Sequence, residues 1–341
     1  MTAETHVQAR PDQYLAELRA DVRAGLTATP KTLPPKYFYD EQGSMLFDEI
    51  TRLPEYYLTR AETAILQSRA AEIAALSRCE SLVELGSGTS AKMALLLRAL
   101  LDAGTLTEFV PLDVDPTVLA DATRVLRSRY PGLHVVPFVG DFERDLGAIP
   151  PASGTRMIAF IGSTIGNLEP AGRALLLAQV AAALRPGDTF LLGTDLVKDP
   201  RRLWDAYNDA AGVTAEFNRN ILRVINAELS ASFDVDAFEH VAFWDATNEW
   251  IEMRLRSVRA QTVTVADLRM TVSFAAGEEM RTEISAKFRP EGVRAELAAA
   301  GLETVRFWTD PASDFGLTLA RRPSAGYGAA RGVLAKIRGG R

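Results

Sequence analysis

The chain has few of the side chains that bind transition metals. Its 341 residues include one cysteine, Cys79, and three scattered histidines, His6, His134 and His240. One cysteine excludes an intrachain disulfide and suits a reducing cytoplasm. The same set offers no cluster of thiolates or imidazoles for zinc. We therefore predict a cytoplasmic protein that needs no metal.

Long apolar runs are also missing, since no stretch approaches the roughly 18 residues of a membrane span. The N-terminus lacks the basic and then apolar pattern of a signal peptide. Six basic residues and no acidic one lie between Arg321 and Arg341, so the rest of the chain carries a net charge of −12, against −6 overall. An acidic body of this kind is a poor candidate for binding nucleic acid. We interpret residues 322–341 as a disordered basic tail.

Two proline-flanked loops near the N-terminus are rich in tyrosine. Tyr37 and Tyr39 follow Pro34-Pro35, and Tyr56 and Tyr57 follow Pro54 in the sequence. A tyrosine offers both a flat face and a hydroxyl, so such loops suit the wall of a binding pocket. The same residues would also serve as core aromatics, and the sequence leaves both interpretations open.

The stretch Leu82–Lys92 has the pattern of a cofactor loop. Leu82–Leu85 reads as a short buried strand, Gly86 and Gly88 allow a tight turn with close ligand approach, and a helix is expected from Ala91. A strand, a glycine turn and a helix N-terminus together form a nucleotide-type site. An ordinary glycine-rich turn between strand and helix would show the same local pattern.

Strand and helix patterns alternate after this stretch. The further strands are expected at Phe109–Asp113, Leu133–Val139, Met157–Ile161 and Thr189–Gly193. Five β-α units in succession predict an α/β fold with a mostly parallel sheet and helices on both faces. Ligands bind such sheets at the carboxyl ends of the strands. Gly86, Asp113, Asp141 and the loop 162–167 all fall at that edge.

The segment after the fifth strand is too long for a simple connection. The next helix of the sheet region, Glu291–Ala300, begins almost a hundred residues later, and a structureless connection of that length would be unusual. We therefore expect residues 195–286 to be an insertion that joins residues 1–60 in a smaller α+β lid domain for substrate. Residues 61–194 and 287–321 would form the cofactor domain, with a C-terminal hairpin completing its sheet.

The acids at the sheet edge favour S-adenosylmethionine (SAM) over a dinucleotide, as does Glu84 just before the glycine turn. A dinucleotide needs helix amides for a pyrophosphate, whereas SAM presents an amino acid, a ribose and an adenine. Asp113 is suited to accept both ribose hydroxyls, and Asp141 to accept the adenine amine with the Phe142 backbone amide alongside. Each acid has an alternative role as a cap of its own loop.

Several motifs of the chain are shared with a known family. They are Pro-Pro-Lys-Tyr-Phe-Tyr-Asp (34–40), Leu-Pro-Glu-Tyr-Tyr (53–57), Val-Glu-Leu-Gly-Ser-Gly-Thr (83–89), Gly-Ser-Thr-Ile-Gly-Asn-Leu (162–168), Gly-Thr-Asp-Leu-Val-Lys-Asp (193–199), Phe-Asn-Arg-Asn (217–220) and Ala-Gly-Glu-Glu-Met-x-Thr-Glu-Ile-Ser (276–285). From about Asp21 to Arg321 the chain resembles the SAM-dependent histidine N-alpha-methyltransferases of ergothioneine biosynthesis. The resemblance implies a Rossmann-like class I methyltransferase domain with a seven-stranded sheet, a substrate domain, and trimethylation of the α-amine of L-histidine to hercynine.

The resemblance also implies the site residues. SAM contacts are implied at Tyr39, Gly86, Lys92, Asp113, Asp141 and Phe142, and histidine contacts at Tyr56, Gly162, Asn167, Tyr207, Met253, Glu283 and Ser285. Tyr39 and Asn167 are the expected catalytic pair, which would hold the α-amine, and Tyr207 would take the carboxylate. Glu283 and Ser285 are two residues apart, so they face the same way in an extended segment. They suit an imidazole with one donor and one acceptor nitrogen.

The expected reaction is a direct in-line transfer of the methyl group to the neutral amine, which depends on positioning and on the exclusion of water. No strong base lies near Asn167 in the sequence, which leaves solvent, or a tyrosine acting through water, as the proton acceptor. The expected partner is L-histidine, bound by a monomer that contacts neither nucleic acid nor membrane. The alternatives are an N-methyltransferase of another small amine or amino acid, a nucleotide-binding oxidoreductase, and a binding protein without turnover.

Overall fold

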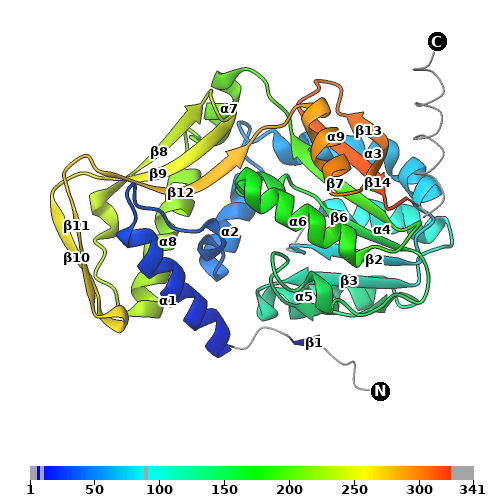
Figure 1. The fold of residues 1–341 in the computed structure, drawn as a ribbon, viewed down its shortest axis with the longest axis horizontal. Helices are drawn as coiled ribbons and strands as arrows, with labels where there is room; N and C mark the ends of the chain where they lie inside the picture. The colour runs from blue at the N-terminus through cyan, green and yellow to red at the C-terminus, as the bar shows by residue number, and fades with distance from the viewer. Residues whose placement is uncertain (1–5, 8–10, 88–90, 324–341) are drawn as a thin grey trace, which may run out of the picture.

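The computed structural model describes residues 6–7, 11–87 and 91–323. The predicted turn residue Gly88 lies outside these ranges, as does the predicted tail from residue 324 onward. Two groups of elements lie side by side in Figure 1, one built around a mostly parallel sheet and the other around antiparallel strands and the helix α1.

The larger sheet has four parallel strands at its centre, in the order β3-β2-β6-β7. Their bounds are β2 Ser81–Leu85, β3 Glu108–Asp113, β6 Arg156–Phe160 and β7 Thr189–Asp195. The hairpin of β13 Glu303–Thr309 and β14 Phe315–Arg321 continues the sheet, with β14 antiparallel to β7. The strand order reverses between β2 and β6, and such a switch point leaves a crevice at the carboxyl ends of the two strands.

Helices cover both faces of this sheet. They are α3 Leu58–Ser77, α4 Ala91–Asp102, α5 Pro116–Arg129, α6 Pro170–Ala183 and α9 Pro290–Ala299. Neighbouring strand residues pack into different apolar clusters: Leu82 joins the cluster that contains α3 and α4, while Val83 joins the cluster that contains α6 and α9. The central strands β2, β6 and β7 are therefore buried at every residue rather than at alternate ones.

One edge of the sheet differs from the prediction. The third expected strand is interrupted, and its two pieces, β4 His134–Val135 and β5 Phe138–Val139, both pair with β3. The break falls at Val136-Pro137, where proline supplies no amide hydrogen for a ladder. With β1 His6–Val7 added beside β5, the sheet has nine strands within the described residues rather than seven.

The prediction of five successive β-α units is wrong at one connection. Between β5 and β6 the structure has only the short 3-10 turn η2, Leu146–Ala148. Two prolines, Pro150 and Pro151, and two glycines, Gly147 and Gly154, lie in this connection, and both residue types disfavour a helix.

The second group of elements comes from both of the segments expected to form the lid domain, residues 1–60 and 195–286. It contains α1 Pro11–Thr27, η1 Pro35–Phe38, α2 Glu41–Ile50, α7 Pro200–Ala206, α8 Val213–Leu229, β8 Phe238–Asp245, β9 Trp250–Ser257, β10 Gln261–Val265, β11 Met270–Phe274 and β12 Glu279–Ala286. Strands β12, β9 and β8 form an antiparallel sheet, β10 and β11 form a hairpin, and α2 packs on α8. One apolar cluster runs from Val22 and Phe217 in this group to Leu191 in the large sheet, so the two groups share a core. We propose that this group is the substrate domain.

Candidate functional site

A cavity lies between the two groups of elements, beside the loop that follows β6. The structure brings to it eight predicted site residues that are far apart in the sequence. They are Tyr39, Tyr56, Gly162, Asn167, Tyr207, Met253, Glu283 and Ser285. Phe47 from α2 and Phe217 from α8 complete an aromatic part of the lining. The remaining predicted site residues lie along the carboxyl edge of the large sheet and are described below.

The acidic wall of the cavity comes from β12. Glu283 and Ser285 both line the cavity, as their spacing in an extended segment predicts. The register of β12 against β9 shifts between Arg281 and Glu283, and such a bulge re-aims the side chains that follow it. Burial raises the pKa of Glu283 to about 7, while the charge of Lys287 and a hydrogen bond from Asn167 act in the opposite direction. The Asn167 amide also donates to the carbonyl of Ile284 at 2.8 Å.

Three tyrosines, Tyr39, Tyr56 and Tyr207, contribute both hydroxyls and rings to the lining. The ring of Tyr39 meets Phe47 and Phe217 edge to face, with centroids 5.7 and 5.5 Å apart, and Tyr56 meets Tyr207 in the same way at 6.5 Å. Burial raises the pKa of Tyr56 and Tyr207, and desolvation of its hydroxyl raises that of Tyr39, although the side chain is 40% exposed. Each therefore keeps its proton at neutral pH, so its hydroxyl can donate a hydrogen bond to a ligand. This disfavours a tyrosine as the proton acceptor, one of the two options that the sequence left open.

Gly86 and Lys92 lie on the cofactor side of the crevice. Gly86 follows β2 with φ +71°, and a Cβ built there would meet no atom within 4 Å, so the turn leaves open space beside it. Lys92, in the first turn of α4, pairs with the buried carboxylate of Glu62. The same carboxylate accepts the amide of Gly162 at 2.9 and 3.0 Å, which ties the start of α4 to the loop at the cavity.

The acids of the neighbouring strands lie along the same edge. Asp113 ends β3 and accepts the amide of Asp115 at 3.0 Å, and burial raises its pKa to about 6. Asp141 follows β5, accepts the amide of Glu143 at 2.9 Å and pairs with Arg144 at 3.4 Å, so it does cap its own loop. The ring of Phe142 packs on Phe160, with centroids 4.9 Å apart.

Glu84 tests whether this edge fits SAM. Its carboxyl group is buried, accepts the hydroxyl of Ser87 at 2.6 Å through Oε2, and has no partner for Oε1 within the described residues. A buried acceptor without a partner is costly, so the position fits a ligand that brings a donor. The amino group of SAM is such a donor, and the open turn at Gly86 and the carboxylate of Asp113 match the rest of the molecule.

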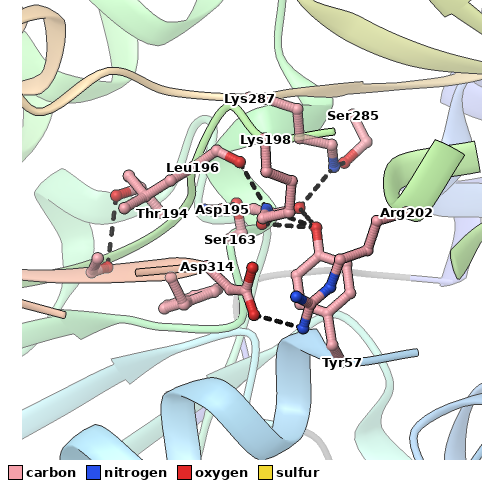
Figure 2. A network of polar contacts seen from close by, with 12 residues as sticks. Tyr57, Ser163, Thr194, Asp195, Leu196, Lys198, Arg202, Ser285, Lys287 and Asp314 are labelled. Atoms are coloured by element: carbon pink, nitrogen blue, oxygen red, sulfur yellow. Dashed lines mark hydrogen bonds and ion pairs between the residues drawn. The ribbon is translucent and has the colours of Figure 1, made fainter. Parts of the chain in front are cut away.

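Sequence reasoning missed three charged residues that lie behind the lining residues Tyr207 and Ser285, and Figure 2 shows the network that they form. Lys287 and Asp195 form a fully buried ion pair at 2.9 Å, and Lys198 pairs with the same carboxylate. The hydroxyl of Tyr57 donates to Asp195 at 2.8 Å, so this loop tyrosine belongs to the support and Tyr56 to the cavity. A signal for Lys287 was present, because it is two residues beyond Ser285 and therefore on the same side of the chain.

The site thus combines neutral hydroxyl donors, one acid with a pKa near 7 and several aromatic faces. Among residues 6–7, 11–87 and 91–323, no group of three or more His, Cys, Asp or Glu side chains is placed to hold a metal ion. In the same ranges we find no helix with the length and apolar character needed to cross a membrane. The arrangement suits binding and orienting a small polar molecule with a ring.

Comparisons with known proteins show which family the chain resembles. Residues 18–322 match the family model described as "Histidine-specific methyltransferase, SAM-dependent". The chain is 60% identical over 311 residues to a histidine N-alpha-methyltransferase of Mycolicibacterium smegmatis, with 91% of this chain and 97% of the relative covered. It is 58% identical over 305 residues to a histidine N-alpha-methyltransferase of Mycobacterium tuberculosis, covering 89% and 95%. Ergothioneine biosynthesis protein 1 of Neurospora crassa is 30% identical over 325 residues, which are 90% of this chain and 35% of that protein.

Proposed function

The chain belongs to the family of SAM-dependent, histidine-specific methyltransferases, and we propose that it methylates the α-amine of L-histidine three times to give hercynine, the first step of ergothioneine biosynthesis. The observation that carries the proposal is the gathering of Tyr56, Asn167, Glu283 and Ser285 around one cavity. This cavity lies beside the loop after β6, at the sheet's switch point, where α/β folds bind their ligands.

We assign the cofactor to the edge formed by Gly86, Lys92, Asp113, Asp141 and Phe142. SAM bound there supplies an electrophilic methyl group on a positively charged sulfur. Asp113 would accept the ribose hydroxyls, and Asp141 with the Phe142 amide would meet the adenine. Desolvation of its hydroxyl raises the pKa of Tyr39, and the charges of Glu283 and Asp113 act in the same direction. Tyr39 also lines the cavity, and its position between Glu283 of the acceptor side and Asp113 of the cofactor edge supports its assignment at the point of transfer.

On the acceptor side, Glu283 and Ser285 would hold the imidazole ring. Asn167 and Tyr39 would orient the α-amine, and Tyr207 would donate to the carboxylate. Holding the amine in line with the methyl group accounts for most of the rate in such a transfer, since no covalent enzyme intermediate is needed. The tyrosine hydroxyls stay protonated, so we assign removal of the amine proton to exchange with solvent.

Three transfers require a site that tolerates a growing alkylammonium ion. Tyr39, Phe47 and Phe217 present aromatic rings to the cavity, and a cation beside an aromatic face is stabilised by about 0.5–2 kcal/mol. We also propose that the protein acts as a cytoplasmic monomer. The single cysteine, Cys79, is buried and free in the structure, which suits a reducing compartment.

Turnover with a panel of amino acids tests the function. Purified protein is mixed with SAM and each of the amino acids in turn, and products are followed by mass spectrometry. The proposal predicts a gain of three CH2 units on histidine. Preferred methylation of another amino acid would support an N-methyltransferase of different specificity, and binding of NAD(H) without SAM binding would support an oxidoreductase. Binding of SAM and histidine without any product would reduce the protein to a binding protein.

A further inference from the structure

The buried cation Lys287 lies directly behind the cavity. Its ammonium group is 2.9 Å from Oδ2 of Asp195, and both side chains are fully buried. It also donates to the hydroxyl oxygen of Tyr207 at 2.9 Å and to Oγ of Ser285 at 2.8 Å. Figure 2 shows the ammonium group between Asp195 and Ser285. Lys287 therefore links two residues that line the cavity to a carboxylate deeper in the protein.

A count of hydrogens shows what this contact does to the two hydroxyls. An ammonium group has three hydrogens to donate and no lone pair. Asp195, Tyr207 and Ser285 take one each, so both hydroxyl oxygens accept a hydrogen bond from behind. Each hydroxyl still has its own O–H hydrogen. The two oxygens lie 2.6 Å apart, so without a ligand one O–H can bind the other oxygen. A ligand that offers an acceptor beside each oxygen can draw both hydrogens into the cavity.

We propose that Lys287 is a positioning residue that makes the hydroxyls of Tyr207 and Ser285 donors toward the cavity, so that the site recognises a ring through an unprotonated nitrogen. The inference rests on the proposed function, in which Glu283 and Ser285 face the imidazole. A neutral imidazole has one N–H and one bare nitrogen. With Glu283 accepting from the N–H and Ser285 donating to the bare nitrogen, the site takes one tautomer of the neutral ring.

The negative charge of Asp195 requires a cation between its carboxylate and the hydroxyls of Tyr207 and Ser285. A carboxylate only accepts hydrogen bonds, and the charge of Asp195 is the largest cause after burial of the raised pKa of Tyr207. The Tyr207 hydroxyl therefore lies within reach of this charge. Without the ammonium group, the carboxylate would draw O–H hydrogens backward and away from the cavity. Lys287 neutralises the buried carboxylate and leaves those hydrogens for the ligand.

Lys198 offers a matched control. It pairs with Oδ1 of the same Asp195 with a side chain that is 9% exposed. Its other hydrogen-bond partners within the described residues are the hydroxyl of Tyr57, at 2.6 Å, and the carbonyl of Leu196. Removing either lysine takes one buried cation from Asp195, but only Lys287 contacts the hydroxyls that line the cavity.

The test compares L-histidine with 3-(pyrrol-2-yl)-L-alanine and 3-(pyrrol-3-yl)-L-alanine. Each analogue keeps one ring N–H and replaces the other nitrogen with CH, so the better of the two keeps its N–H at Glu283 and loses the acceptor for Ser285. The readout is the ratio of kcat/KM for histidine to kcat/KM for that analogue. The wild-type ratio is expected to be roughly 10 to 100, because the analogue leaves a buried donor unpaired.

In Lys287→Met the ratio should fall to about three or less, because Ser285 no longer presents its hydrogen to the ring, and the loss should appear mainly as a higher KM for histidine. Lys198→Met should keep the wild-type ratio even where its unfolding temperature falls. A wild-type ratio in Lys287→Met would overturn the proposal. If Lys287→Met does not fold, Lys287→Gln replaces it, and if neither folds the residue is structural and the proposal is wrong. A wild-type protein that methylates none of the three compounds would instead contradict the proposed function.

Discussion

Glu62 and Lys92 form a buried ion pair between α3 and the first turn of α4. The Glu62 carboxylate is fully buried, and its two oxygens also accept the amide of Gly162 at 2.9 and 3.0 Å. Gly162 has φ +81°, and a Cβ built there would lie 3.7 Å from the ammonium nitrogen of Lys92. This pair therefore joins the cofactor edge of the sheet to the loop that lines the acceptor cavity.

Glu62→Gln should weaken both the fold and the cofactor site. Glutamine can still accept the Gly162 amide, but it leaves the ammonium group of Lys92 without its countercharge. Breaking a buried ion pair in this way typically costs about 3–5 kcal/mol. We expect a lower free energy of unfolding in urea and a higher KM for SAM. Glu49→Gln, at an exposed position of α2, is the control and should change neither, and an unfolding curve for Glu62→Gln that overlays the wild type would contradict this role.

Glu84 should make stability depend on pH. Burial raises its pKa from 4.5 to about 8, so the folded protein retains a proton that the unfolded chain releases. The stabilisation from this group is fully present below pH 4.5 and is lost as the pH rises through about 8. Glu84→Gln removes the titration. In the absence of SAM, its free energy of unfolding relative to wild type should therefore increase between pH 5 and pH 8 by up to a few kcal/mol. Parallel pH profiles for the two proteins would show that Glu84 does not titrate there.

Asp113 should make SAM binding depend on pH. Burial raises its pKa to about 6, and only the carboxylate form accepts two ribose hydroxyls. SAM affinity, measured by calorimetry, should therefore increase as the pH rises from 5 to 7. Asp113→Asn should bind SAM roughly 10- to 100-fold more weakly, with little dependence on pH over that range. Asp121→Asn, in the exposed Arg124–Asp121 pair of α5, should behave like wild type, and a pH-dependent Asp113→Asn would assign the titration to another group.

Replacing Glu283 should raise the KM for histidine without changing SAM binding. Glu283→Gln keeps the size of the side chain but removes the negative charge, so its hydrogen bond to an imidazole N–H weakens. Hydrogen bonds to charged groups contribute about 1.5–3 kcal/mol, which predicts a rise of roughly 10- to 100-fold in the KM for histidine. Its pH profile should also lose the inflection near pH 7, where wild-type KM falls as the carboxylate forms. Unchanged histidine kinetics would remove Glu283 from the site, and Glu291→Gln on the exposed side of α9 serves as the control.

The sequence was informative where one pattern determines one structural outcome. Parallel strands place their carboxyl ends together, so the sequence alone assigns Gly86 and Asp113 to the same edge. The expected strand Leu133–Val139 contains Pro137, which cannot donate to the ladder, and in the structure the strand is interrupted there. The sequence left open whether the loop tyrosines form a pocket wall or belong to the core. In the structure Tyr39 and Tyr56 line the cavity, whereas Tyr57 is buried and binds Asp195.

The buried charges could not be assigned from the sequence, because their partners are far away along the chain. Glu62 accepts the amide of Gly162, which lies 100 residues further along the chain. Lys287 and Asp195 are also far apart in the sequence and form their ion pair only in the folded protein. A charged residue in a sequence is usually solvent-exposed, and apart from the spacing of Lys287 from Ser285 nothing local marks these residues as exceptions. Their burial depends on the junction between the two groups of elements, which only the folded structure shows.

The position and number of methyl groups on the product test the central claim most directly. Purified protein is incubated with L-histidine and SAM carrying a 13C-labelled methyl group, and the product is analysed by NMR. The account predicts a single 13C signal from three equivalent methyl groups on the α-nitrogen, with both ring nitrogens unmodified. Methyl groups on the ring, or no incorporation at all, would contradict the placement of the imidazole at Glu283 and Ser285 and of the amine at Asn167 and Tyr39.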